Sequence, residues 1–281
     1  MPHLSTGWIA AASVAILFAI LYPLVLAFIA HQRLKVSWNY FLYGIVIFFL
    51  FQVISRIPLV TVAQIALAKP LKESVGFQWV WLVILVVTAG LFEEVGRYVG
   101  YRTFMRREEK TWNKAVMYGL GHGGLESILL VGLGGAANLI TLIALTTKPL
   151  SGLPSGQRAA VANLLATATA QPGWFPLLGA WERLWTLPAH VALSVLVLQV
   201  FRRHNIGWLW LALAGHALLD GASVGLLQVL PKGLSAYLIV EGVVALFGLL
   251  AIWIIFRLRD RPDMAGDATS GVARPATPAL T

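Results

Sequence analysis

The sequence predicts an all-α membrane protein, a polytopic helical bundle with about seven transmembrane helices. Of its 281 residues, 58% are hydrophobic and only 12% are charged, and the mean hydropathy is +0.78. This is far more apolar than a soluble domain. Apolar stretches also recur at the length of about 20 residues that a helix needs to cross the hydrocarbon layer. The predicted spans cover residues 7–30, 38–66, 76–96, 113–133, 174–201, 205–227 and 236–257.

The segments outside these spans define the domain organisation. The first span lacks a charged leader and a small-residue cleavage pattern, so we expect it to be retained. The apolar segment 138–147 is too short to cross alone and is expected to lie at the interface or pack back into the bundle. Residues 259–281 are rich in Pro, Ala, Gly, Thr and Asp without periodicity, which is typical of disorder. We therefore expect one transmembrane domain, 1–258, and a disordered cytoplasmic tail, 259–281.

The basic residues predict the orientation. Taking the connections alternately, one side holds thirteen basic residues and the other holds five: Lys69, Lys72, Lys148, Arg158 and Lys232. Because cytoplasmic loops carry the excess of Lys and Arg, the N-terminus is expected outside and the C-terminus in the cytoplasm. The net charge of +9 is then explained by topology and by contact with anionic membrane lipids. Nothing in the pattern indicates a nucleic-acid partner.

Ionisable residues inside the spans are candidates for function, because they are costly in hydrocarbon unless they are paired or hydrated. The third span contains three of them in the stretch GLFEEVGRYVGYR, and four further spans contain others. The candidates are Glu93, Glu94, Arg97, His122, Glu126, Glu182, Arg183, His190, His216, Asp220 and Glu241.

Their spacing places them on shared helix faces. Glu93 and Arg97 are four residues apart, and so are the two pairs His122/Glu126 and His216/Asp220. At about 1.5 Å per residue, Glu93 and His122 each lie roughly 13 Å from the cytoplasmic end of their spans. His190 and His216 lie roughly 18 Å from theirs. We therefore expect a glutamate and three histidines at one level of the bundle.

A buried glutamate beside histidines suits two kinds of hydrolysis. The carboxylate could act as general base toward water, with imidazoles stabilising an oxyanion. Alternatively, His122, His190 and His216 could bind Zn²⁺, which would activate the water. The sequence has no HExxH or GxSxG motif and no cysteine, so it offers no zincin motif, serine elbow or thiolate ligand. The glycines around His122, in GLGHGGLES, either permit close packing or are simply common in membrane helices.

Four ordered motifs carry a resemblance to a known group. They are Glu93-Glu94-x-x-Arg97, Gly121-His122-Gly123-Gly124-x-Glu126, Glu182-Arg183 with His190, and His216-x-x-x-Asp220. Together they resemble the YhfC-type intramembrane metalloproteases, which are related to the CAAX prenyl proteases and bacteriocin-processing enzymes (CPBP) and to the PrsW proteases. The resemblance covers residues 76 to 226.

The resemblance implies roles for these residues. Glu93 or Glu94 would activate water, Arg97 would orient the pair, and His122 would be the histidine of the second motif. His216 with Asp220 matches the motif that positions water or the oxyanion. Arg97 comes one residue earlier than in the CAAX proteases, which argues against a prenylated substrate. Glu126, Arg183 and His190 favour the YhfC and PrsW side, and metal- and glutamate-dependent chemistry both remain open.

The sequence therefore predicts a multi-pass intramembrane protease of the cell (cytoplasmic) membrane that hydrolyses a membrane protein or peptide in or beside the bilayer. A proton- or ion-coupled transporter also buries such residues, but it would be expected to show an internal repeat. A non-catalytic membrane scaffold of the same fold is the other alternative. For single motifs, structural roles compete: Glu94 with Arg97 could be an interfacial ion pair, and Glu182 with Arg183 a structural one.

Overall fold

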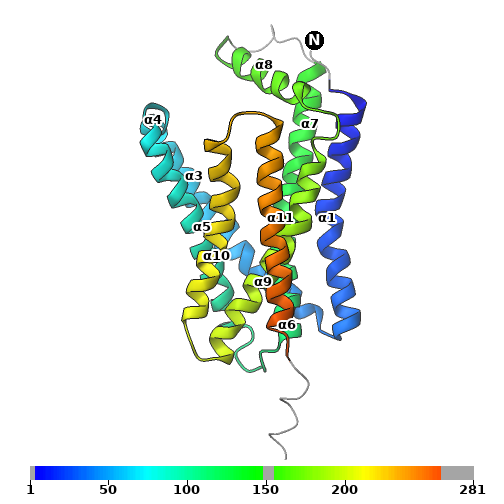
Figure 1. Ribbon diagram of the computed structural model, residues 1–281, viewed down its shortest axis with the longest axis vertical. Helices are drawn as coiled ribbons and strands as arrows, with labels where there is room; N and C mark the ends of the chain where they lie inside the picture. Colours follow the sequence, from blue (N-terminus) through cyan, green and yellow to red (C-terminus); the bar gives the residue numbers. More distant parts are fainter. Residues whose placement is uncertain (1–3, 148–154, 261–281) are drawn as a thin grey trace, which may run out of the picture.

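The computed structural model describes residues 4–147 and 155–260, and all regular elements within them are helical. Seven helical stretches are long and apolar enough to cross a membrane, and they run up and down the bundle (Figure 1). The predicted fold class is confirmed, whereas the predicted tail lies, from residue 261 on, outside the described residues. The spans are α1 (Thr6–Leu34), α2–η1–α3 (Trp38–Phe48, Phe49–Arg56, Ile57–Ala66), α5 (Val75–Thr103), α6–η2–α7 (Trp112–Glu126, Ser127–Leu133, Gly134–Thr147), α9 (Leu177–Arg202), α10 (Gly207–Val229) and α11 (Leu234–Arg257).

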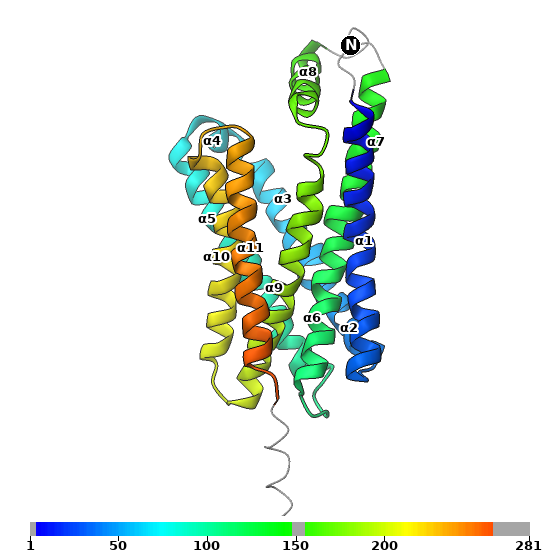
Figure 2. The same ribbon diagram turned by 45° about the vertical axis from the view of Figure 1, so that its right-hand side comes forward.

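Two shorter helices lie in the connections. Helix α4 (Ala68–Glu73) joins α3 to α5, and α8 (Ser155–Ala170) follows α7. Leu165 and Ala168 of α8 pack with Leu142 of α7, next to Leu4 and Trp8 near the N-terminus. Figures 1 and 2 show α8 at the end of the bundle where α1 begins.

The fourth span is longer than the sequence predicts. Helices α6 and α7 are joined without a break through the π-helix η2, so the span runs over Trp112–Thr147, 36 residues. The prediction that 138–147 lies apart from the fourth span, at the interface or packed back into the bundle, was wrong, because this segment forms most of α7 and continues that span. The glycines at 132, 134 and 135 lower the local hydropathy, but the helical hydrogen bonding continues through them.

Helix α9 lies at the centre of the bundle. In the most apolar 18-residue window of α9, 78% is buried inside the protein, whereas the corresponding share is 11–28% in the other spans. It packs against α1, α5, α6, α10 and α11, which expose large apolar side chains such as Leu17 and Leu246 on their outer faces. Outward apolar faces around a buried helix are what a bundle in lipid requires. The polar residues in the middle of α9 therefore lie inside the protein: Arg183, Thr186, His190, Ser194 and Gln199.

Pro188 in α9 makes possible a hydrogen bond between α9 and α1. Proline has no backbone N–H, so the carbonyl of Leu184, one turn earlier, loses its helical donor. The hydroxyl of Tyr22 donates to this carbonyl at 3.4 Å. The proline thus offers α1 a hydrogen-bond acceptor close to His190.

Glycines allow α6 to approach α2 and α9 closely. A Cβ on Gly121 would overlap the backbone carbonyl of Phe41, and one on Gly123 would lie 2.7 Å from Cβ of His190. Small residues at such contacts let membrane helices pack backbone to backbone. Of the two interpretations of these glycines, the packing one holds, and it places His122 next to His190.

We expect Gly121→Ala to lower the free energy of unfolding by about 1–3 kcal/mol, because the carbonyl that the new methyl meets belongs to a helix backbone. Gly225→Ala in α10 is the matched control, since a Cβ there meets nothing within 4 Å. Alanine should be neutral or favourable at that helical position. Unfolding by SDS in mixed micelles measures both variants, and equal effects would contradict the close packing of α6.

The basic residues gather at one end of the bundle. The connections α1–α2, α5–α6 and α9–α10 and the end of α11 lie at the same end (Figures 1 and 2). They carry Arg33, Lys35, Arg102, Arg106, Arg107, Arg203, Arg257 and Arg259. This grouping agrees with the charge asymmetry of the sequence. That this end faces the cytoplasm stays a prediction.

Candidate active site

The polar residues of four spans meet in one group inside the bundle, which we name the acid–histidine cluster. Eight of the eleven ionisable candidates belong to it, and each contacts at least one other member. Glu182 and Arg183 adjoin it through Glu126, whereas Glu241, on α11, is not a member. Helix α5 contributes three members, α6 two, α9 one and α10 two. They are Glu93, Glu94, Arg97, His122, Glu126, His190, His216 and Asp220.

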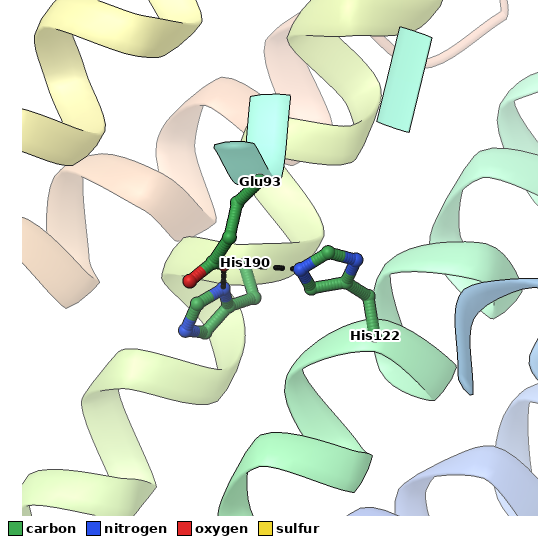
Figure 3. A group of neighbouring side chains, drawn as sticks. All are labelled: Glu93, His122 and His190. Carbon is green, nitrogen blue, oxygen red and sulfur yellow. Dashed lines mark hydrogen bonds and ion pairs between the residues drawn. The ribbon is translucent and has the colours of Figure 1, made fainter. Parts of the chain in front are cut away.

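Glu93 lies at the centre of the cluster and is only 3% exposed. Its Oε2 is 3.0 Å from Nε2 of His122 and 3.8 Å from Nδ1 of His190. Figure 3 shows these three side chains directed at one another. Its Oε1 lies 3.8 Å from Nε2 of His216. One carboxylate therefore faces all three histidines, as their common depth in the sequence predicts.

Arg97 fixes the tautomer of His190. Its guanidinium is fully buried and donates to Oε1 of Glu94, and it lies 3.4 Å from Oε2 of Glu93. It is also 2.8 Å from Nδ1 of His190. Since arginine can only donate, Nδ1 must accept and the ring proton resides on Nε2. That Nε2 donates a hydrogen bond to Oε2 of Glu126 at 2.8 Å.

His216 has one ring nitrogen free to act. Its Nδ1 donates to Oε1 of Glu94 at 2.7 Å, which holds the ring in place. Its Nε2 has no hydrogen bond among the described residues, and it lies 3.6 Å from Oδ2 of Asp220. A carboxylate on one nitrogen with the other nitrogen exposed to a cavity is the arrangement that prepares a histidine for proton transfer.

A cavity of about 340 Å³ opens beside the cluster. Its volume lies at the lower end of the range for small-ligand sites. Apolar residues of α5 and α10, including Leu82 and Val224, form part of its wall. Five of the eight cluster residues line it, whereas Glu94, Arg97 and His122 lie behind the wall. The five are Glu93, Glu126, His190, His216 and Asp220. Of the two adjacent glutamates, it is thus Glu93 that faces the cavity.

The ion pair between Glu182 and Arg183, raised as a structural alternative, is present and extends into the cluster. Arg183 donates to Oε1 of Glu182 and, at 2.9 Å, to Oε1 of Glu126. Glu126 in turn accepts from His190. Arg183 therefore supports the cavity wall by holding the carboxylate that orients His190.

Gln52 and Arg56 complete the site and were not among the predicted residues. Both lie on the π-helix η1, a structure that often occurs at functional sites. Gln52 is 5% exposed and donates to Oε1 of Glu93 at 2.5 Å. Arg56 donates to the carbonyl of Leu85 at 2.6 Å and to Oε1 of Gln52 at 3.4 Å. In the sequence, the position of Gln52 in the middle of the apolar run FFLFQVIS is the signal that could have revealed this residue.

Glu93, His122 and His190 could hold a metal ion. Each offers one ligand atom, and these atoms lie within 4.8 Å of one another. Two histidines and one glutamate are a ligand set of catalytic zinc. The group differs from the predicted three histidines in having Glu93 in place of His216, whose Nδ1 is bound by Glu94.

Two features of the histidines bear on how well these residues would bind a metal. Arg97 donates to the same Nδ1 of His190 that faces Glu93, so it would have to release this atom. Nδ1 of His122 is buried and finds no partner within the described part of the chain. Ligand histidines usually donate this second N–H. The type, number and proximity of the donors nevertheless suit a divalent cation.

The charge balance of the site also suits a cation. Five carboxylates lie in or next to the cavity, against three guanidinium groups. With these groups ionised and the imidazoles neutral, two negative charges remain. Uncompensated charge is costly in a buried site, so a divalent cation or protons would stabilise this group of carboxylates. The five carboxylates counted are those of Glu93, Glu94, Glu126, Glu182 and Asp220, and the three guanidinium groups are those of Arg56, Arg97 and Arg183.

Comparison with known proteins agrees with this site. The family model described as YhfC intramembrane metalloprotease matches residues 16–244, which include the whole acid–histidine cluster. The chain is 28% identical over 241 residues to the uncharacterized membrane protein YhfC of Bacillus subtilis (strain 168), covering 84% of this chain and 91% of that protein. No solved structure shows a significant match. The relation to the CPBP and PrsW proteases stays a prediction.

Proposed function

Since the chain belongs to the YhfC intramembrane metalloprotease family, we propose that it is an intramembrane endopeptidase that hydrolyses a peptide bond in or beside the bilayer. The observation that carries the proposal is the cavity inside the bundle. Into it face the carboxylate of Glu93 and the free Nε2 of His216, 3.8 Å apart. The cavity beside this base and this second proton-transfer group has room for a water molecule and a carbonyl group.

Glu93, His122 and His190 would hold the cation, and zinc is the metal that this set of donors suits best. A bound zinc ion would act as a Lewis acid and make a water molecule in the site more acidic. In a metal-free site, Glu93 itself would be the base that takes a proton from water. Both forms of the reaction use the same side chains.

The remaining residues position these groups. Gln52 holds Oε1 of Glu93, so that Oε2 is directed at His122. Glu94 holds Nδ1 of His216. In hydrolysis the C–N bond breaks, water oxygen bonds to the carbonyl carbon, and a proton passes to the leaving amine. Nε2 of His216 carries no proton while Nδ1 donates to Glu94, so it would first take a proton that the attacking water releases and then pass it to the leaving amine.

The setting limits the substrate to chains that reach the membrane interior. The cavity lies among seven apolar spans, and residues such as Leu130 and Val224 line it. A membrane protein or membrane-bound peptide is therefore the substrate class that we propose. We also propose that the protein lies in the cell membrane, with its N-terminus outside, which is the orientation that the positive-inside bias favours.

Metal content and cleavage, measured on the same purified samples, test the proposal. We expect the wild-type protein in detergent to hold zinc stoichiometrically and to cleave members of a library of membrane-protein peptides. His122→Ala should lose both properties. His204→Asn is the matched control, since it removes an exposed imidazole outside the cluster at a position with positive φ that asparagine tolerates.

The outcomes separate the alternatives. Cleavage without metal would assign the reaction to water activated by Glu93. Neither metal nor cleavage in well-folded protein would contradict the proposal and favour ion-coupled transport or a scaffold role.

A further inference from the structure

A second cavity, of about 560 Å³, lies between α9, α10 and α11, and we name it the α9–α11 groove. Small residues leave this space open: Ala192 of α9, Ala214 and Gly215 of α10, and Ala251 of α11 all line it. Its walls are apolar, except that Arg203 and Arg257 lie at one end. It is therefore an apolar channel with a basic end.

The length of the groove matches one leaflet of a bilayer. Along α11 it extends from Phe247 to Arg257, which is about 15 Å at the rise of an α-helix. Half of the hydrocarbon core of a bilayer is also about 15 Å thick. The two arginines belong to the basic end of the bundle, which would meet the phosphate groups of one leaflet if the seven spans cross a bilayer. Trp208, a residue type common at this depth, lines the groove at the same end.

The two arginines carry unneutralised charge. Neither Arg203 nor Arg257 forms an ion pair among residues 4–147 and 155–260, whereas the neighbouring Arg202 pairs with Asp260. Arg203 stacks over the ring of Trp208 at 4.8 Å and donates to Oε1 of Gln199 at 3.0 Å, which fixes the direction of its guanidinium. Guanidinium groups bind phosphate oxygens in a favourable paired geometry.

We propose that the α9–α11 groove binds an anionic phospholipid, with an acyl chain between the three helices and the phosphate on Arg203 and Arg257. This site is distinct from the acid–histidine cluster and does not depend on the proposed function. The two are nevertheless neighbours, because Leu193 and Leu219 line both the groove and the cavity. The bound acyl chain would lie against the outer side of these two leucines and separate the cavity wall from the bulk lipid.

A membrane-spanning peptide fits the groove less well. Such a helix needs about 30 Å of apolar surface, twice the length of the groove. Transmembrane helices also carry Lys and Arg preferentially on the cytoplasmic side, which would meet the two arginines at the predicted cytoplasmic end. A lipid with a negative headgroup fits both the length of the groove and the charge of its basic end.

Lipid-dependent thermal stabilisation in detergent tests the proposal, with phosphatidylglycerol and phosphatidylcholine of identical acyl chains as probes. We expect half-maximal stabilisation of the wild type at about 25-fold lower concentration of phosphatidylglycerol than of phosphatidylcholine, since each of the two arginines favours an anionic lipid by about fivefold. Arg203→Gln/Arg257→Gln should abolish this preference. Arg106→Gln/Arg107→Gln removes the same charge from exposed positions outside the groove, and this variant should retain the preference for phosphatidylglycerol.

A second pair of variants tests the apolar part of the site. Ala214→Trp fills the groove from an exposed position and should weaken binding of both lipids at least tenfold, while Leu249→Trp, on the lipid-facing surface outside the groove, should not. Equal loss of preference in both arginine pairs would reduce the effect to general surface charge and overturn the proposal. It would also be overturned if Ala214→Trp blocked binding of a hydrophobic peptide but left lipid binding unchanged.

Discussion

Glu93→Gln is expected to abolish peptide hydrolysis, with a loss of about 10²–10⁴-fold, the usual contribution of a general base or acid. Glutamine keeps the shape of the side chain but can neither take a proton nor serve as an anionic ligand. Glu94→Gln is the matched variant one residue away. It should retain activity reduced by about 10–100-fold, as is typical for a group that orients a functional side chain. The difference follows from the cavity, which Glu93 lines and Glu94 does not.

Cleavage rates with one peptide substrate, measured beside zinc content, check both variants. Glu93→Gln should also lower the zinc content, whereas Glu94→Gln should leave it unchanged. A larger loss of activity in Glu94→Gln than in Glu93→Gln would exchange the roles of the two glutamates and contradict the assignment of Glu93 as the metal ligand or, without metal, the base.

Arg97→Met is expected to lower the free energy of unfolding by about 3–5 kcal/mol, the cost of removing one partner from a buried ion pair. Arg97 is fully buried and contacts Glu93, Glu94 and His190. Its loss leaves two carboxylates without their cation in the bundle interior. Methionine fills a similar volume, so the loss reports on charge more than on packing.

The double variant Glu94→Gln/Arg97→Met separates charge from packing. Because it also removes one of the stranded carboxylates, it should recover part of the lost stability, which SDS unfolding in mixed micelles can measure. Two losses that simply add would show that Arg97 acts through packing rather than through its ion pairs.

Much of the fold and of the candidate site could be predicted because a membrane simplifies the problem. Apolar stretches of the right length give the spans, and ionisable residues inside them must face the protein interior. The four-residue spacing of His216 and Asp220 then gives a shared face, and counting along the helices gives the depth. These arguments placed Glu93, His122, His190 and His216 at one level, where the structure brings them into contact.

The parts that could not be predicted depend on contacts between helices. Glu93 and Glu94 are adjacent and point in directions about 100° apart. Which one faces the cavity is decided by how α5 rotates against α9 and α10. Gln52 is uncharged, so the count of ionisable residues passes over it. The segment 138–147 appears separate because glycines lower the hydropathy before it, although the backbone hydrogen bonds continue.

The π-helices η1 and η2 bear on how sequences of this family can diverge. A π-turn holds about one residue more than an α-turn, so deleting a single residue within 49–56 would restore α-helical winding. Such a deletion would leave the helices on either side in phase but would change which side chain this turn directs at Glu93. The hydropathy profile and the number of spans would remain the same. A relative that lacks this one residue would therefore look like a complete member of the family while presenting a different side chain to Glu93, and only the count of residues between Phe48 and Ile57 would reveal it.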